Sequence, residues 1–207
     1  MTVHDLGDPR RLVVVSATAT EAAHMPAGIE TVICGIGKVD AAAVTTAAVL
    51  RAAERTGAHS PEDITVVNTG TAGALHDGHS GLYTPSAVTN HDISSEALRA
   101  LGHPLVDRIE LPGGDGSVLA TGDVFVSDPA VRSRLSERAD LVDMEGFAIA
   151  RACGLLGTRA VLVKYVSDDA DASAMDWPAL VDRCARELGR WVDEHIGHDR
   201  SGAPSTG

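Results

Sequence analysis

Two acidic stretches decide the fold of this chain: Val142-Asp143-Met144-Glu145-Gly146 and, further on, Tyr165-Val166-Ser167-Asp168-Asp169. Each follows a short apolar run, Leu141-Val142 in the first case and Ala160-Val161-Leu162-Val163 in the second. Such runs are typical of buried strands, and open α/β sheets bind their ligands outside the carboxyl ends of the strands. Carboxylates at that edge favour acid/base catalysis or the binding of hydroxyl groups.

Strands and helices alternate along the rest of the chain. The apolar run Leu12-Val13-Val14-Val15 predicts a first strand buried on both faces, and Glu21 follows it as a third acid. Helices are expected at residues 40–55, 129–138, 145–156 and 177–195, with a short helix or turn at 94–101. Further strands are expected at 31–34, 64–67, 81–91, 105–111, 117–120 and 160–166, with a tight turn over 69–73. The pattern predicts a single α/β domain over residues 11–197, a flexible leader over 1–10 and a disordered tail over 198–207.

Bulk properties exclude several classes of protein. The 207 residues, 44% of them hydrophobic, suffice for one large domain with its own core. The sequence contains no run of about 18 apolar residues, so no membrane-spanning helix is expected. Residues 1–9 do not resemble a signal peptide, and the cytoplasm is therefore the expected location. A net charge of −12 and only two residues each of Trp, Tyr and Phe argue against nucleic-acid binding. The widely spaced Cys34, Cys153 and Cys184 are expected to be buried thiols.

Taken together, six segments resemble the purine nucleoside phosphorylase and nucleosidase family, and within it the methylthioadenosine/S-adenosylhomocysteine nucleosidase branch. Besides the two acidic stretches they are Val15–Glu21, Gly35–Ala41, Val67–Gly73 and Thr121–Val126, in family order over most of the chain. The resemblance implies a central twisted mixed β-sheet flanked by helices, a purine nucleoside as substrate, no cofactor or metal, and a homodimer.

Cleavage of an N-ribosidic bond passes through an oxocarbenium-like transition state and sets three tasks. By resemblance, Asp168 protonates the leaving purine at N7, which at neutral pH requires a raised pKa. Glu145 holds the ribose 2′- and 3′-hydroxyls, and Glu21 activates the attacking water. The alternative readings are a turn cap for Asp168, a helix N-terminal acid for Glu145 and a solvated helix-start glutamate for Glu21.

The resemblance also assigns binding residues. Met144 lies against the sugar, Phe125 and Val126 line the base pocket, Thr71, Ala72 and Gly73 belong to the ribose- and water-binding loop, Lys164 completes the water site, and Ser167 neighbours Asp168. Core packing is the alternative for Met144, Phe125 and Val126. The chain departs from the family at Thr71, usually serine, at Lys164, usually arginine, and at Thr18, usually apolar.

Water is favoured over phosphate as the nucleophile. The related phosphorylases carry an arginine before the central glycine loop, where this chain has Asn68, and Lys38 is the cation nearest to the glycine turn. Three alternatives remain open: a futalosine hydrolase, which differs at the 5′ group, a phosphate-dependent phosphorylase, and a non-catalytic nucleoside-binding relative. Residues 91–115 are the segment expected to contribute to 5′ specificity.

Three other motifs give weaker indications of function. Gly35-Ile36-Gly37 lacks the third glycine of a dinucleotide site, because Asp40 stands there. His76-Asp77-Gly78-His79 indicates an exposed turn rather than a metal pair. Residues 105–112 alternate apolar and charged side chains, as a half-buried strand does; this strand either reaches the pocket of a second subunit or packs within its own chain.

Overall fold

The first strand lies near one edge of the sheet and is buried on both faces. β1 (Leu12–Ser16) has five residues, all buried. It pairs in parallel with β2 (Glu30–Ile33) on one side and with β3 (Thr65–Ala74) on the other. The computed structural model describes residues 6–170 and 177–196 of the chain.

The remaining elements follow the expected alternation of strands and helices. The other strands are β4 (Leu82–Tyr83), β5 (Ala87–Asn90), β6 (Arg108–Glu110), β7 (Val118–Thr121), β8 (Leu141–Asp143) and β9 (Arg159–Asp168). The α-helices are α1 (Lys38–Thr56), α2 (Ser95–Ala100), α3 (Pro129–Ser136), α4 (Gly146–Leu156) and α5 (Trp177–His195), and two short 3-10 helices are η1 (Pro9–Arg11) and η2 (Pro61–Asp63).

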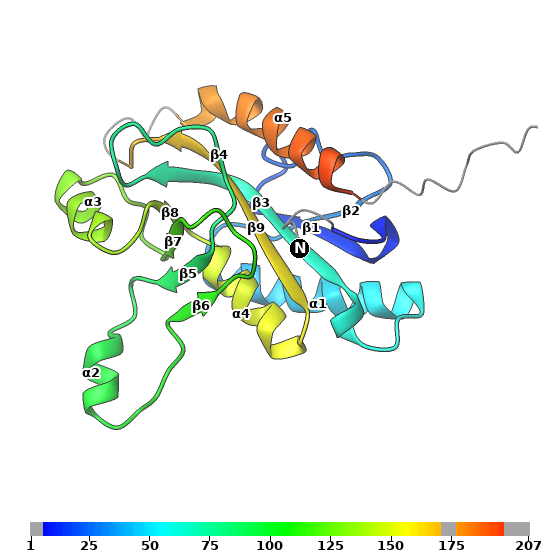
Figure 1. Cartoon of the computed structure of the whole chain (residues 1–207), viewed down its shortest axis with the longest axis horizontal. Coiled ribbons are helices and arrows are strands. Elements are labelled where there is room, and N and C mark those ends of the chain that lie inside the picture. The colour runs from blue at the N-terminus through cyan, green and yellow to red at the C-terminus, as the bar shows by residue number, and fades with distance from the viewer. Residues whose placement is uncertain (1–5, 171–176, 197–207) are drawn as a thin grey trace, which may run out of the picture.

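The described strands form one mixed sheet. Its order is β2-β1-β3-β8-β7-β5-β6, and β9 pairs with both β3 and β4. β3 is parallel to β1 and β9 but antiparallel to β8. The prediction of a single α/β domain with a central mixed sheet flanked by helices is therefore confirmed (Figure 1).

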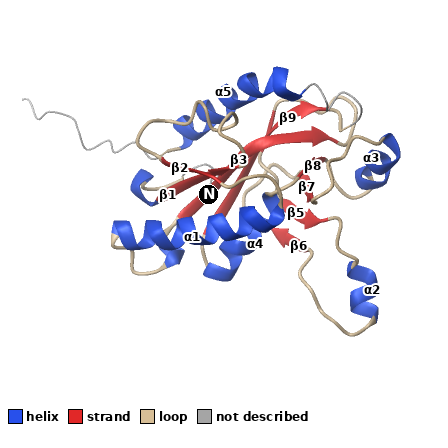
Figure 2. Ribbon diagram, turned by 180° about the vertical axis from the view of Figure 1, so that it is seen from behind, coloured by secondary structure: helices blue, strands red, loops and turns tan. Residues whose placement is uncertain are grey.

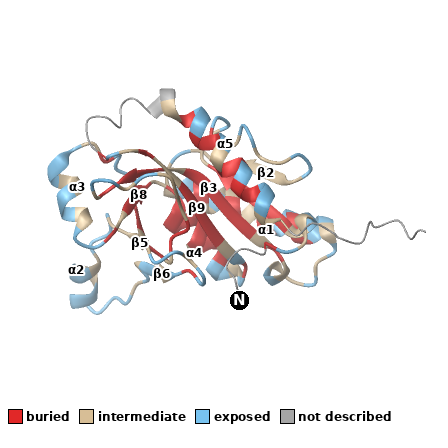
Figure 3. Ribbon diagram, turned by 45° about the horizontal axis from the view of Figure 1, so that its top comes forward, coloured by how far each residue is buried: buried red, intermediate tan, exposed pale blue. Residues whose placement is uncertain are grey.

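Helices cover both faces of the sheet, as Figure 2 shows from behind. Val13 and Val15 of β1 pack with residues of α1 and α4 on one face. Leu12 and Val14 face the other way and pack with Leu188 and Val192 of α5. Burial on both faces explains why the strand is an uninterrupted apolar run, and Figure 3 shows the buried layer lying between the helices.

The tight turn expected over residues 69–73 is wrong, because β3 continues as a strand to Ala74. Its ladder with β9 runs from Thr65 opposite Arg159 to Gly73 opposite Asp168. A Cβ on Gly70 would lie 3.3 Å from the carboxylate of Glu21, and one on Gly73 would lie 2.9 Å from Cβ of Ala170. The glycines therefore make room for side chains that cross the strand instead of bending it.

Three helix ends in the described part of the chain have residues that suit them. α1 and α4 end at Gly57 and Gly157, both in the left-handed conformation, with φ of 62° and 72°. Asp128 caps α3 by accepting a hydrogen bond from the N–H of Ala130. The three cysteines are free and buried. No helix in the described part of the chain is long and apolar enough to cross a membrane.

Within the expected leader, residues 1–10, the second half contacts the folded domain. Leu6 is only 2% exposed, and its N–H donates to the carbonyl of His195 at the end of α5. Residues 1–5 and the expected tail, 198–207, lie outside the described residues. β6 pairs with β5 of its own chain, while α2 projects from the body and buries none of its residues (Figure 1).

We expect Gly189→Ala to destabilise the fold. A Cβ there would lie 2.1 Å from the carbonyl oxygen of His24, so α5 would have to move off the turn that carries Glu21, at a cost of about 1–3 kcal/mol. Gly154→Ala in α4 is the matched control, because nothing lies within 4 Å of its Cβ position. That change should stabilise the fold by about 0.8–1 kcal/mol through helix propensity. Urea unfolding of both variants measures the contrast, and a destabilisation of equal size in both would contradict it.

Candidate active site

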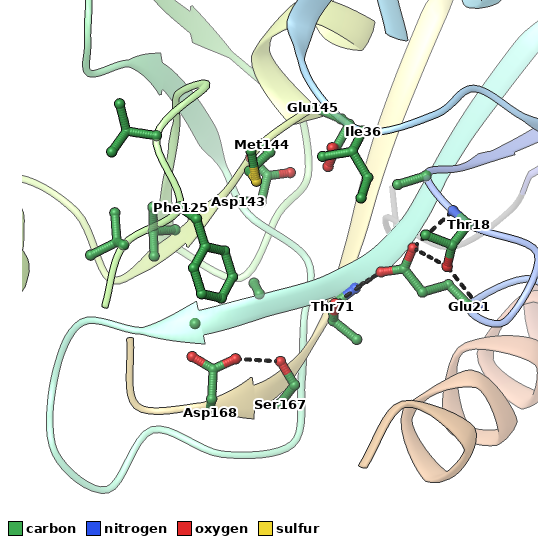
Figure 4. A pocket seen from close by; sticks show the side chains of 16 residues that line it. Thr18, Glu21, Ile36, Thr71, Phe125, Asp143, Met144, Glu145, Ser167 and Asp168 are labelled. Carbon is green, nitrogen blue, oxygen red and sulfur yellow. Dashed lines mark hydrogen bonds between the residues drawn. The ribbon is translucent and has the colours of Figure 1, made fainter. Parts of the chain in front are cut away.

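One cavity of about 410 Å³ lies at the ends of β1, β3, β8 and β9 (Figure 4). Gly73 of β3 pairs with Val142 of β8 and with Asp168 of β9, so both acidic stretches meet across this strand. The cavity is lined by every predicted site residue except Lys164, namely Glu21, Thr71, Ala72, Gly73, Phe125, Val126, Met144, Glu145, Ser167 and Asp168. The edge expected from the sequence is therefore where the cavity lies.

Glu21 is held by four hydrogen bonds. Its Oε1 accepts from the N–H and the hydroxyl of Thr71, at 2.8 and 2.9 Å. Its Oε2 accepts from the N–H and the hydroxyl of Thr18, at 3.1 and 3.0 Å, and that hydroxyl in turn accepts from the N–H of Glu21. This reciprocal arrangement has the hydrogen-bond pattern of a capping box, here at a turn and not at a helix. With 4% exposure, Glu21 is not the solvated glutamate of the alternative reading.

Glu145 stands at the N-cap position of α4, but its side chain caps nothing. Its Oε1 accepts a hydrogen bond of 2.9 Å from the N–H of Gly37 in the glycine turn. Burial raises the pKa of Glu145 to about 7, and the neighbouring Asp143 carboxylate raises it too, whereas Lys164 and the Gly37 N–H lower it. Glu145 is therefore a group that can change its charge near neutrality.

Asp168 closes the end of β9. Its Oδ2 accepts from the hydroxyl of Ser167 at 2.7 Å, and its Oδ1 accepts from the N–H of Ala170 at 2.8 Å. The second bond is the turn cap of the alternative reading, so Asp168 caps a turn and lines the cavity at once. Figure 4 shows Ser167 and Asp168 across the cavity from Met144 and Glu145.

Lys164, which the resemblance assigns to the water site, is buried behind the wall of the cavity. Its side chain is 1% exposed and does not line the cavity; its ammonium lies 2.8 Å from Oδ2 of Asp143. A lysine in an apolar strand needs a buried counter-charge. That need was the sequence signal that could have found Asp143, a cavity-lining residue to which we assigned no role.

Apolar residues form the remaining wall and the mouth. Val126 is buried in a core cluster, whereas Phe125 is 50% exposed, so core packing alone does not explain Phe125. Ile36 and Val124, two lining residues absent from the predictions, are 63% and 60% exposed. The mouth of the cavity is therefore apolar.

The described cavity lining is acidic. Glu21, Asp143, Glu145 and Asp168 are its charged members, and it contains no lysine, arginine or histidine. Asn68 is 1% exposed, and its amide donates to the carbonyl of Val15 at 3.0 Å. Lys38 pairs instead with Asp92 and with Asp123. Neither position 68 nor Lys38 therefore supplies a phosphate-binding cation to the cavity.

The sequence profile of the phosphorylase superfamily matches residues 28–196. The chain belongs to this superfamily. It is 30% identical to the 5′-methylthioadenosine/S-adenosylhomocysteine nucleosidases of Bacillus thuringiensis (strain Al Hakam) and Bacillus cereus (strain G9842). Each of these alignments covers 65% of this chain and 65% of the curated relative. The family resemblance inferred from the six segments is thereby confirmed.

Several solved structures share the fold of this chain. The methylthioadenosine/S-adenosylhomocysteine nucleosidase of Helicobacter pylori superposes with a TM-score of 0.75 at 21% identity, covering 91% of this chain and 98% of that one. The futalosine hydrolase of Helicobacter pylori strain 26695 gives 0.73 at 21% identity, covering 89% and 96%. The Neisseria meningitidis nucleosidase in complex with methylthio-immucillin-A gives 0.71 at 22% identity, covering 88% and 96%.

Proposed function

We propose that this protein is a nucleosidase that hydrolyses the N-ribosidic bond of a purine nucleoside of the methylthioadenosine/S-adenosylhomocysteine type. The observation that carries the proposal is one cavity in which Glu21, Glu145 and Asp168, three acids from distant segments, line the wall without a cation among the described lining residues. Sequence similarity to curated nucleosidases supports the same reaction class.

The three acids divide the chemistry. Asp168 donates a proton to the leaving purine, and Glu21, fixed by Thr18 and Thr71, accepts a proton from the attacking water. Glu145 accepts hydrogen bonds from the ribose hydroxyls. The binding roles assigned by resemblance to Met144, Phe125, Val126, Ala72, Gly73 and Ser167 are part of the proposal, and all of these residues line the same cavity.

Hydrolysis is favoured over phosphorolysis by charge. A phosphate dianion in this cavity would lie among four acidic side chains and would meet no described lysine, arginine or histidine in the lining. Bidentate arginines or a nest of backbone N–H groups normally hold such an anion. Water needs neither.

The same lack of a cation bears on the 5′ group of the substrate. A carboxylated 5′ group, as in the futalosine alternative, requires room and a counter-charge, whereas the exposed mouth residues Ile36, Val124 and Phe125 are apolar. The proposal therefore favours an apolar 5′ group. The presence of all three acids in one cavity also argues against a non-catalytic binding relative.

We further propose a homodimer in the cytoplasm. Apolar side chains left exposed at the cavity mouth suit a subunit contact. The three free, buried thiols fit a compartment that keeps cysteines reduced, which cell fractionation would check.

A panel of purine nucleosides, with and without phosphate, tests the reaction. We expect free base and free sugar at equal rates in both conditions, with methylthioadenosine cleaved faster than futalosine or inosine. Accumulation of ribose-1-phosphate in the phosphate arm would identify a phosphorylase, and a preference for futalosine would reassign the 5′ specificity.

Asp168→Asn should lower kcat for purine release by about 10²–10⁴, the usual contribution of a general acid. The matched control is Asp169→Asn, because Asp169 is exposed and does not line the cavity, and its turnover should match that of the unmodified protein. Circular dichroism checks that both variants fold. A folded Asp168→Asn variant with full turnover would remove Asp168 from the acid role.

Sedimentation at micromolar concentration tests the dimer. We expect a species of twice the chain mass of 21.4 kDa, held by an interface of roughly 1,000 Å² or more. A monomer that still cleaves nucleosides would show that one chain makes the complete site.

A further inference from the structure

The ion pair between Asp143 and Lys164 lies at the wall of the cavity, which Asp143 lines and Lys164 does not. Both side chains are 1% exposed, and the ammonium lies 2.8 Å from Oδ2 of Asp143. Burying such a pair is costly unless further hydrogen bonds satisfy its polar atoms. Asp143 has those bonds: its Oδ2 also accepts from the N–H of Gly146, at 2.9 Å, and its Oδ1 accepts from the hydroxyl of Thr121, at 2.5 Å.

These bonds give Asp143 the capping function of α4. The N–H of Gly146 bonds Asp143 directly, and the N–H of Phe147 donates to the Thr121 hydroxyl, which itself donates to Asp143. The first N–H groups of a helix need such acceptors. Glu145, at the N-cap position, makes no side-chain cap bond. Because Asp143 takes the cap, the carboxylate of Glu145 is released toward the glycine turn and the cavity.

The pair also acts on the charge of Glu145. Asp143 on β8 and Glu21 after β1 place negative charge near it, and Lys164 on β9 places positive charge there. Beside the neighbouring glycine turn, Lys38 pairs with Asp92 and with Asp123. Burial raises the pKa of the nearby Cys34 thiol to about 11, so this group is neutral. Asp143 and Lys164 therefore act on Glu145 in opposite directions.

We propose that Asp143 and Lys164 are a pair of positioning residues for Glu145, which aim its carboxylate into the cavity and set the pH at which it becomes ionised. The direction of the Glu145 carboxylate follows from the capping of α4 by Asp143. The pH at which Glu145 ionises follows from the two opposite charges buried beside it. The consequence for sugar binding rests on the proposed function. An ionised Glu145 accepts hydrogen bonds from two hydroxyls, whereas a protonated one also carries a donor.

The ionisation of Glu145 can be measured without any activity. In the folded chain its pKa is raised from its ordinary 4.5 to about 7. Its contribution to stability is therefore complete below pH 4.5, is lost as the pH rises and is gone above about 7. The difference in unfolding free energy between the protein and its Glu145→Gln variant falls over this window and levels off at the folded pKa, so its upper bend gives the midpoint at which folded Glu145 ionises.

The experiment repeats this pair of unfolding measurements, with and without Glu145→Gln, in three single variants. Lys164→Met should raise the midpoint, because the cation that favours the carboxylate is lost. Asp143→Asn should lower it, because the like charge is lost; each shift is expected on the order of one pH unit. Lys164→Arg, which keeps the charge, is the matched control and should leave the midpoint in place. Folded variants whose midpoints move together, or do not move, would overturn the proposal.

A variant that fails to fold does not end the test. The double variant Asp143→Asn/Lys164→Met buries no unpaired charge, and its midpoint should lie below that of the unmodified protein, because Asp143 acts on Glu145 more strongly than Lys164 does. An unchanged or higher midpoint there contradicts the proposal.

A second readout separates this inference from the proposed function. The KM for a riboside should fall as the pH rises through the same midpoint and should move with it in each variant. Opposite midpoint shifts without cleavage of any nucleoside would support the positioning role of Asp143 and Lys164 and contradict the proposed nucleosidase activity. Cleavage of a nucleoside with unmoved midpoints would support the activity and contradict the positioning role.

Discussion

The parallel ladder between β3 and β9 is the constraint on which the rest of the structure depends. It holds these two long strands in register from Thr65 opposite Arg159 to Gly73 opposite Asp168. A slip of one residue would exchange the faces of β9 and take Lys164 out of reach of Asp143. The same register brings Asp168 to the end of the sheet where β8 delivers Glu145. Helix packing on both faces fixes the ladder, and the ladder fixes the relative places of the acids.

The buried acids are tolerated to different degrees, and the difference follows the donors that each one receives. Glu21 accepts four hydrogen bonds, and Asp143 accepts two together with an ion pair. Glu145 is shown with one, from the N–H of Gly37. Burial, and after it the charge of the neighbouring Asp143, raises the pKa of Glu145. The least satisfied acid is also the one with lone pairs left for a ligand.

Much of this could be predicted from the sequence, since the strongest signals are local. The apolar run of β1, Gly57 and Gly157 at the helix ends, and the acids after β8 and β9 all depend on neighbours in the chain. The features that could not be predicted involve contacts between distant segments. The continuation of β3 through Gly70 and Gly73 depends on side chains that cross it from Glu21 and Asp168, and the burial of Leu6 depends on the end of α5. The partner of Lys164 stands on another strand, and its identity depends on the sheet order.

The acidic lining of the cavity stabilises the reactant and the transition state of a reaction to different degrees. An uncharged nucleoside gains little from surrounding carboxylates, whereas a sugar that becomes positive as its bond breaks gains a great deal. In a nucleosidase, the surplus negative charge of this cavity would thus contribute little to the affinity for the reactant and much to lowering the barrier. The cost of holding these carboxylates together falls on the folded protein before any ligand arrives. The same carboxylates thereby lower the stability of the folded protein and raise the rate of the reaction.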